Sequence, residues 1–228
     1  MNFKVNVGCG QTPTEGFRNI DNSFSVRLSR LPGRGRFLFR LGVISPEQYA
    51  FIQAAARHKI EFGDAIKGLS FDDNSCSLVY SSHVLEHVDV HNSETFVREI
   101  YRILEPGGVF RLALPDLRLR ADEYMNSGNA DRFVESLFMD CPRPKGLVSR
   151  LKLAMFGSRK HLWMYDGPSA SQLLERNGFQ GPRVLSAGET TIDDPGSLNL
   201  REREDESFYV EARKPNDDLS HQYSLTKP

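Results

Sequence analysis

The 228-residue sequence predicts an α/β fold built on a doubly wound, mostly parallel seven-stranded sheet. Strand-like apolar segments alternate with helix patterns along the chain, which is typical of that class. Residues 78–80 form a continuous apolar run, as expected for a strand buried inside a parallel sheet. Two closing strand patterns follow the last predicted helix. At this length we expect one domain over residues 1–214, with helical insertions at about 24–57 and 117–160.

The first strand leads directly to a candidate ligand site. Residues 3–7 alternate apolar and polar side chains, which is the period of a strand, and the pattern ends at Gly8. Gly8 and Gly10 lack a Cβ, so the backbone can turn sharply and approach a ligand closely. A second short apolar segment ends at Asp21. In open α/β sheets an acid at this strand end binds ribose hydroxyls, so the pattern predicts a nucleoside site.

The glycine pair alone is not specific, because Gly-x-Gly after a strand is often an ordinary turn. The third glycine of the dinucleotide fingerprint is absent, and Thr12 stands in that region. Asp21 follows Gly8 by only 13 residues, whereas the dinucleotide pattern places its acid about 20 residues on. A nicotinamide cofactor is therefore disfavoured.

Five further elements are predicted in the first half of the remaining chain. Residues 45–57 predict a helix, since Ser45 can cap it and Pro46 suits its first turn. Residues 60–62 and 76–81 predict the third and fourth strands. Ser93 and Glu94 are predicted to cap a helix that Pro106-Gly107-Gly108 ends, and residues 109–114 predict the fifth strand.

The second half of the chain completes the alternation. The insertion at 117–160 is expected to be mostly helical, and Ser169–Asn177 predicts a helix ended by Gly178. Residues 183–185 and 207–213 predict the last two strands. The polar tail at 215–228 is expected to be disordered.

Composition excludes several classes of protein. A net charge of -1 gives no general attraction to nucleic acid, and no nucleic-acid partner is expected. The three cysteines form no Cys-x-x-Cys pair, which argues against a disulfide scaffold and a zinc site. No apolar run approaches the roughly 20 residues that span a bilayer. We expect a cytoplasmic protein.

Residues 61–114 carry the most specific motifs of the chain. They include Leu-Val-Tyr-Ser-Ser-His-Val-Leu-Glu-His-Val and Ile-Leu-Glu-Pro-Gly-Gly. With residues 5–21 they resemble the class I S-adenosylmethionine-dependent methyltransferases, in particular the type 11 group with Leu-Glu-His-Val and Leu-x-Pro-Gly-Gly elements. The resemblance implies a Rossmann-like fold, S-adenosylmethionine as cofactor, and methyl transfer to a small-molecule or glycan hydroxyl. The alternatives are a cofactor-binding scaffold without turnover and a dinucleotide-dependent oxidoreductase.

The resemblance also implies roles for individual residues at the cofactor site. The methionine part of the cofactor would lie beside Gly8, Cys9 and Gly10, and its ribose would contact Asp21. The adenine amino group would meet Asp64, with Ala65 in the same loop. The floor of the cofactor site would include Ser81. Asp21 as a turn residue and Asp64 as a surface residue are the alternatives. The chain departs from the common motif at Asn6 and Thr12.

His83 and Asp116 are the candidate catalytic residues. His83 follows the fourth strand, where this family usually places a residue facing the transferred methyl, and a neutral imidazole can act as a general base. Its alternative is a histidine that hydrogen-bonds a loop; that of Asp116 is a helix N-cap. Glu86 and His87 are interpreted as structural. Some quinone-biosynthesis relatives hold a divalent metal with this segment, but they carry an acid at the position of His83, so no metal is expected.

The methyl acceptor is predicted only by class. Residues 159–166 and 206–212 weakly resemble uncharacterised methyltransferases associated with bacterial surface-polysaccharide genes. Basic residues gather in Arg27–Arg40 and Arg143–Lys160, and apolar side chains at 37–39 interleave with the first group. We expect these segments to hold an anionic acceptor, with peripheral membrane contact; the alternative is two solvated surfaces. His161, Trp163 and Tyr165 would suit a sugar, and a packed core position is the alternative for Trp163.

Overall fold

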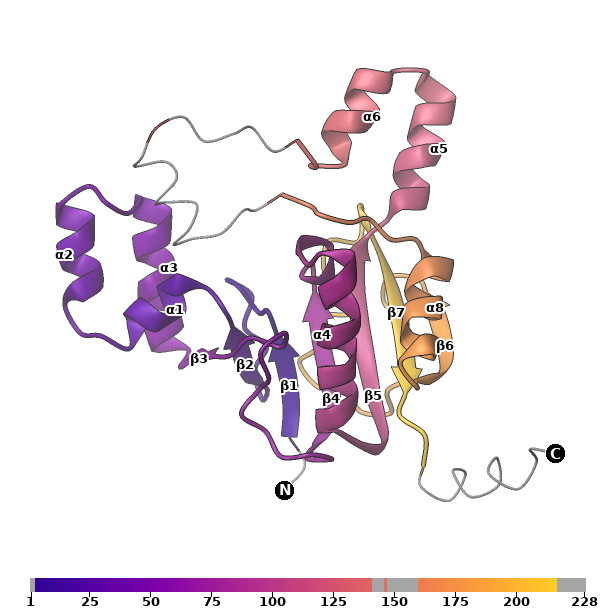
Figure 1. The fold of residues 1–228 in the computed structure, drawn as a ribbon, viewed down its shortest axis with the longest axis horizontal. Coiled ribbons are helices and arrows are strands. Elements are labelled where there is room, and N and C mark those ends of the chain that lie inside the picture. Colours follow the sequence, from indigo (N-terminus) through magenta and orange to yellow (C-terminus); the bar gives the residue numbers. More distant parts are fainter. Residues whose placement is uncertain (1–2, 141–145, 147–159, 217–228) are drawn as a thin grey trace.

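The computed structural model describes residues 3–140, 146 and 160–216, and its centre is one seven-stranded sheet (Figure 1). The strand order is β3-β2-β1-β4-β5-β7-β6. Strands β1 to β5 pair in parallel, and β7 is antiparallel to both β5 and β6. All seven predicted strands are present: β1 (Phe3–Val7), β2 (Arg18–Asp21), β3 (Glu61–Phe62), β4 (Cys76–Ser82), β5 (Leu104–Pro115), β6 (Gln180–Leu185) and β7 (Ser207–Arg213). The predicted fold class is confirmed.

One face of the sheet is covered by two helices, α4 (Val90–Ile103) and α8 (Gly167–Arg176), which lie side by side in Figure 1. The buried side of α4 presents Phe96, Ile100 and Ile103 to the sheet, at the 3.6-residue period of an amphipathic helix. Leu173 and Leu174 extend this core from α8. Apolar burial on this face therefore holds the helices to the central strands.

Helix α4 does not begin where the sequence predicts. Its N-cap is Asp89, whose Oδ1 accepts hydrogen bonds from His91 N at 3.1 Å and Asn92 N at 3.0 Å. The prediction of Ser93 as the cap is wrong, because its buried hydroxyl donates to Val90 O inside the first turn. The helix also ends earlier than predicted, at Ile103, and residues 106–108 belong to β5.

Helix α8 also begins two residues before the predicted start, with Asp166 as its N-cap. Asp166 Oδ1 accepts from Ser169 N at 2.8 Å, and Ser169 Oγ accepts from Asp166 N at 3.0 Å, which completes a capping box. The predicted stop at Gly178 is confirmed. Its φ of 94° is left-handed, and Phe179 N returns to Leu174 O at 3.1 Å.

The first insertion folds into three helices beyond the β3 edge: α1 (Phe24–Ser29), α2 (Arg34–Arg40) and α3 (Pro46–Arg57) (Figure 1). The predicted cap of α3 is confirmed, since Ser45 and Gln48 form a capping box. Val26 and Ala55 pack with Cys9 and Ile60, so α1 and α3 reach the loop after β1.

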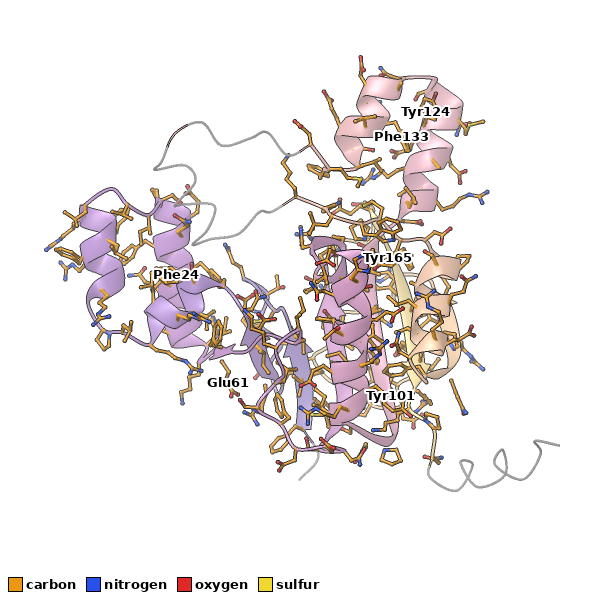
Figure 2. All side chains as sticks on the ribbon, in the orientation of Figure 1. Phe24, Glu61, Tyr101, Tyr124, Phe133 and Tyr165 are labelled. Carbon is orange, nitrogen blue, oxygen red and sulfur yellow. The ribbon has the colours of Figure 1, made fainter. Side chains whose placement is uncertain are left out.

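The second insertion contributes a helical hairpin, α5 (Leu117–Ser127) and α6 (Ala130–Ser136), which extends beyond the carboxyl ends of the parallel strands (Figure 1). Figure 2 shows Tyr124 and Phe133 facing each other between the helices, and their rings stack with centroids 5.1 Å apart. Most of the predicted basic segment at 143–160 lies outside the described residues, as does the predicted tail from residue 217.

The opposite face of the sheet is covered by the loop between β6 and β7, residues 186–206, rather than by a helix. Leu198 and Leu200 of this loop pack on Leu78, Tyr80 and Val109. No helix occurs in residues 186–206 or in the short connection between β1 and β2. The loop therefore takes the place that a covering helix would fill.

A buried ion pair fastens this loop to the sheet. Arg111 on β5 and Glu211 on β7 are direct cross-strand partners, joined by a hydrogen bond of 2.5 Å, and their side chains are 0% and 1% exposed. Arg111 Nη1 also donates to Glu189 O at 3.0 Å. Glu211 accepts from the Thr191 amide and hydroxyl, both at 2.6 Å. Burial alone would raise the pKa of Glu211, but these hydrogen bonds outweigh it and lower the pKa.

We expect Glu211→Gln to destabilise the protein by about 3–5 kcal/mol, because it leaves the Arg111 guanidinium buried without a counter-charge. A lowered pKa means that the stability contributed by Glu211 is present above its ordinary pKa near 4.5 and is lost as the pH falls through the folded value. The stabilities of wild type and variant should therefore converge on acidification. Denaturant unfolding between pH 7 and pH 3 measures both effects.

The matched control is Glu204→Gln, which breaks the exposed Arg201–Glu204 pair on the same loop. Such surface pairs contribute at most about 1 kcal/mol. Equal effects of the two substitutions at pH 7 would contradict the special role of the buried pair.

Candidate active site

The glycine loop after β1 is hydrogen-bonded to the carboxyl end of β2. Gly8 N and Cys9 N both donate to Ile20 O, at 2.7 and 3.0 Å. Asp21 is 9% exposed, and its two carboxylate oxygens accept from Gly10 N at 3.1 Å and Ser23 N at 2.8 Å. The structure thus brings together the predicted Gly8–Gly10 loop and Asp21, and fixes the carboxylate at the strand end.

The two glycines of this loop meet different surroundings. A Cβ built on Gly8, where φ is +75°, would lie 2.2 Å from Val84 Cγ2. Gly8 therefore permits close contact between the loop after β1 and the segment after β4. A Cβ at Gly10, where φ is +51°, would meet no atom within 4 Å. The backbone at Gly10 faces open space of the kind that a ligand could fill.

The two departures from the family motif are built into this loop. Asn6 is 2% exposed, and its Nδ2 donates to Thr14 Oγ1 at 3.0 Å. Thr12 Oγ1 donates to Cys9 O at 3.1 Å, so both side chains hold the turn. Burial, and then the Asp21 charge, raise the pKa of the Cys9 thiol. Cys9 is therefore a neutral packing residue near pH 7.

The other predicted cofactor residues lie on neighbouring strand ends. Asp64 follows β3, where Gly63 N donates to Asp21 O at 3.3 Å. Asp64 Oδ1 accepts from Ile66 N at 3.1 Å, and its Oδ2 lies 3.1 Å from Lys67 Nζ. Ala65 and Ser81 are buried, and among the described residues Ser81 Oγ has no hydrogen-bond partner.

His83 adopts a left-handed backbone, with φ of 51°, directly after β4. Such conformations are uncommon outside glycine and gather at functional sites. Its side chain is 8% exposed, and Nε2 lies 2.8 Å from Ser207 Oγ. Nδ1 lies 3.1 Å from Arg203 Nη1 and 3.2 Å from Glu86 Oε1. The imidazole thus faces the Ser207 hydroxyl on its Nε2 side. On its Nδ1 side it faces the Arg203 guanidinium and the Glu86 carboxylate.

Asp116 stands at the end of β5 as the N-cap of α5. Its Oδ1 accepts from Arg118 N at 2.9 Å, which is the alternative that the sequence left open. The backbone of Asp116 pairs with Tyr165, and Leu117 N donates to Tyr165 O at 3.0 Å. This pairing brings the end of the second insertion, including the Tyr165 labelled in Figure 2, to the same sheet edge.

Glu86 and His87 belong to a short 3-10 turn, η1 (Leu85–His87). Glu86 is 1% exposed, and His87 Nε2 lies 3.9 Å from its Oε1. His161 comes close to this turn, with its ring centroid 5.2 Å from that of His87. Burial lowers the pKa of His161, against the opposing effect of Glu86. Trp163 is 45% exposed, so the alternative of a packed core tryptophan is wrong.

The 186–206 loop and the first residue of β7 bring further residues to the site, which local sequence patterns do not predict. Glu202 accepts from Tyr80 OH at 2.6 Å and from Thr12 Oγ1 at 3.1 Å. Arg203 and Ser207 contact His83. More than 100 residues separate each from its partner, so no local pattern could predict these contacts.

Comparison with known proteins agrees with this geometry. A family model described as "Methyltransferase domain" matches residues 42–112. No curated protein matches the chain significantly. A solved Methanosarcina mazei S-adenosylmethionine-dependent methyltransferase shares the fold at 17% identity, with 95% of this chain and 93% of that one covered and a TM-score of 0.50. Two further structures are similar at lower scores. One is a Haloferax volcanii complex of the Trm112 methyltransferase activator with a protein described as a "putative methyltransferase" (16% identity, 94% and 82% covered, TM-score 0.49), and the other is a Thermotoga maritima S-adenosylmethionine-dependent methyltransferase (14%, 94% and 82%, 0.47).

An acid on the second strand and a glycine loop after the first lie together at the carboxyl ends of the strands. Residues 42–112 match a methyltransferase domain model, so the chain contains a methyltransferase domain, and the Methanosarcina mazei structure shares the fold. Within residues 3–140, 146 and 160–216, no helix has the length and apolar character to cross a membrane.

Proposed function

We propose that the protein transfers a methyl group from S-adenosylmethionine to a hydroxyl of a small molecule or glycan, with His83 as the general base. The observation that carries this proposal is His83 Nε2, which meets a hydroxyl, Ser207 Oγ, at 2.8 Å from a strained position after β4. The bound cofactor supplies an electrophilic methyl on its sulfonium. The protein supplies position and proton transfer, and ordering two reactants can lower the barrier by roughly 7–11 kcal/mol.

The residues present fit the cofactor. Asp21 is a fixed carboxylate at the end of the second strand, suited to ribose hydroxyls. Gly10 borders open space, and the buried Ser81 hydroxyl lacks a described partner. Gly8 and Cys9 shape the turn, and Asp64 and Ala65 are assigned to the adenine side on the strength of the family resemblance.

The surroundings of His83 favour its use as a base. The Glu86 carboxylate, 3.2 Å from Nδ1, favours the tautomer with the proton on that nitrogen. Nε2 then carries the lone pair that accepts a proton from a hydroxyl. Arg203 contacts the same Nδ1 and can only donate, so it opposes this tautomer. In our proposal Arg203, which is 56% exposed, turns to an anionic acceptor and releases the imidazole.

We expect Asp21→Ala to weaken S-adenosylhomocysteine binding at least tenfold, about 1.4 kcal/mol, because the ribose hydroxyls lose a charged hydrogen-bond acceptor. Calorimetric titration measures the affinity, and a parallel titration with NAD⁺ should show no binding to the wild type. Asp122→Ala, which removes an exposed acid on α5, is the matched control. Unchanged affinity in Asp21→Ala would refute the assignment.

We expect His83→Asn to lower turnover roughly 10²–10⁴-fold while cofactor affinity stays near that of the wild type. Asparagine tolerates the same left-handed backbone but cannot act as the base. The acidic limb of the pH–rate profile, which reports protonation of the base, should disappear.

Ser207→Ala is the control for this experiment, because it removes the partner of Nε2 and keeps the base. Near-normal turnover in His83→Asn would return His83 to a structural role. Asp116 would then become the candidate base.

We also propose that α2 forms a basic and apolar surface that binds an anionic membrane, where an anionic acceptor would be located. Phe37 and Leu41 are 62% and 60% exposed on one side of α2, one helical turn apart. Arg34, Arg36 and Arg40 lie on the same helix, and it contains no acid. A short helix of this kind rests on an anionic lipid surface through apolar insertion and charge attraction.

Arg36→Ser with Arg40→Ser should weaken binding to anionic liposomes and flatten its salt dependence, since each basic residue contributes about 1 kcal/mol near such a surface. Sedimentation with phosphatidylserine vesicles at two salt concentrations measures this. Arg118→Ser with Arg132→Ser, on the α5–α6 hairpin, is the control for net charge. Wild-type binding by the α2 variant would show that these arginines are a solvated surface.

A further inference from the structure

Glu86 is a buried carboxylate that has a close imidazole neighbour, His83 Nδ1 at 3.2 Å from Oε1, but no hydrogen bond of good geometry in the described part of the chain. Its side chain is 1% exposed, and neither oxygen finds a hydrogen-bond partner in the described part of the chain. Leaving a charge unpaired in the interior is costly, and proteins resolve it by pairing the charge or by coordinating a metal. The position of Glu86 therefore calls for a cation.

Two histidines face this carboxylate from different segments. One ligand atom from each of Glu86, His87 and His161 lies within 4.8 Å of the other two. His87 Nε2 is 3.9 Å from Glu86 Oε1. The rings of His87 and His161 meet edge to face at 66°. His161 follows His87 by 74 residues, so no local sequence pattern predicts that the two meet.

We propose that Glu86, His87 and His161 form a binding site for a divalent transition metal, with zinc as the best match. Zinc in proteins takes imidazole nitrogen and carboxylate oxygen at about 2.0–2.2 Å, so a modest contraction of the cluster would complete three bonds. Two imidazoles and one carboxylate disfavour magnesium and calcium, which prefer oxygen ligands. This proposal departs from the expectation, drawn from the sequence, that the protein binds no metal.

The surroundings of both histidines suit metal ligation. His87 Nδ1 lies 3.0 Å from Lys160 O, so it donates there and leaves the Nε2 lone pair on the side of Glu86. Metal-bound histidines are commonly oriented by such a bond to a carbonyl. His161 Nδ1 lies 3.2 Å from Met164 Sδ. Both histidines are half-buried, which leaves a path for the ion and a fourth position for water.

A metal at this site would join the segment of His161, at the end of the second insertion, to the turn η1 after β4. The backbone already joins them, since Leu162 N and Trp163 N donate to Glu86 O at 2.7 and 3.2 Å. A metal bound by η1 and His161 would add three strong bonds to that junction. The competing partner of Glu86 is the His83 imidazole, whose Nδ1 lies 3.2 Å from Glu86 Oε1. This inference does not depend on the proposed methyl acceptor or base.

The experiment uses the full chain without an affinity tag, stripped of metal by chelator and dialysis. Zinc titration by calorimetry should give one site per chain, and zinc should raise the Tm of the wild type. Cobalt, titrated in its place, should give visible absorption bands from a nitrogen-rich site. Glu86→Gln and His161→Ala should each weaken zinc binding at least tenfold and remove the Tm increase.

His91→Ala is the matched control, because His91 is an exposed histidine on α4 outside the cluster. It should bind zinc as the wild type does. The Tm of each metal-free variant shows whether it folds, and Glu86→Gln preserves the shape of the side chain if His161→Ala does not fold. Absence of one-to-one zinc binding at micromolar concentrations, or wild-type affinity in Glu86→Gln, would overturn the site and leave the His83 imidazole as the partner of Glu86.

Discussion

The buried Arg111–Glu211 pair supports the half of the molecule that has no covering helix. It joins β5 to β7 at 2.5 Å, and further hydrogen bonds from the two side chains hold the 186–206 loop through Glu189 and Thr191. That loop carries Arg203 to the imidazole of His83. A charge pair inside a core is not a general source of stability. Here the hydrogen bonds of the pair fix one conformation of the 186–206 loop. The position of Arg203 beside His83 in the candidate site depends on that conformation.

A steric constraint couples the two halves of the site. Gly8 has no side chain, so Val84 occupies the place where its Cβ would stand, 2.2 Å from Val84 Cγ2. The segment after β4 thereby packs on the loop that holds Asp21, and His83 is held one residue from this contact. His83 N also donates to Ala113 O at 2.9 Å, which ties the same turn to β5. The Gly8–Gly10 loop and His83 are therefore packed against each other.

The sequence predicts those parts of the structure that local patterns determine. All seven strands, the Ser45 cap and the carboxylate of Asp21 at a strand end follow from side-chain period and turn chemistry. The start of α4 was missed because Asp89 and Ser93 are both good caps, and burial of Ser93 decides between them. Arg203 and His161 contact residues that are far away in the sequence. These contacts depend on the conformation of long loops, which the periodicity of side chains does not predict.

Glu86 links the two proposals made for this edge of the sheet. Its Oε1 lies 3.2 Å from His83 Nδ1, so in the proposed function it orients the imidazole with Nε2 toward the acceptor hydroxyl. A metal on Glu86, His87 and His161 would bind the same carboxylate. Metal binding and the orientation of His83 would therefore both depend on one buried side chain. The same 3-10 turn that anchors the second insertion would then tune the imidazole beside the acceptor.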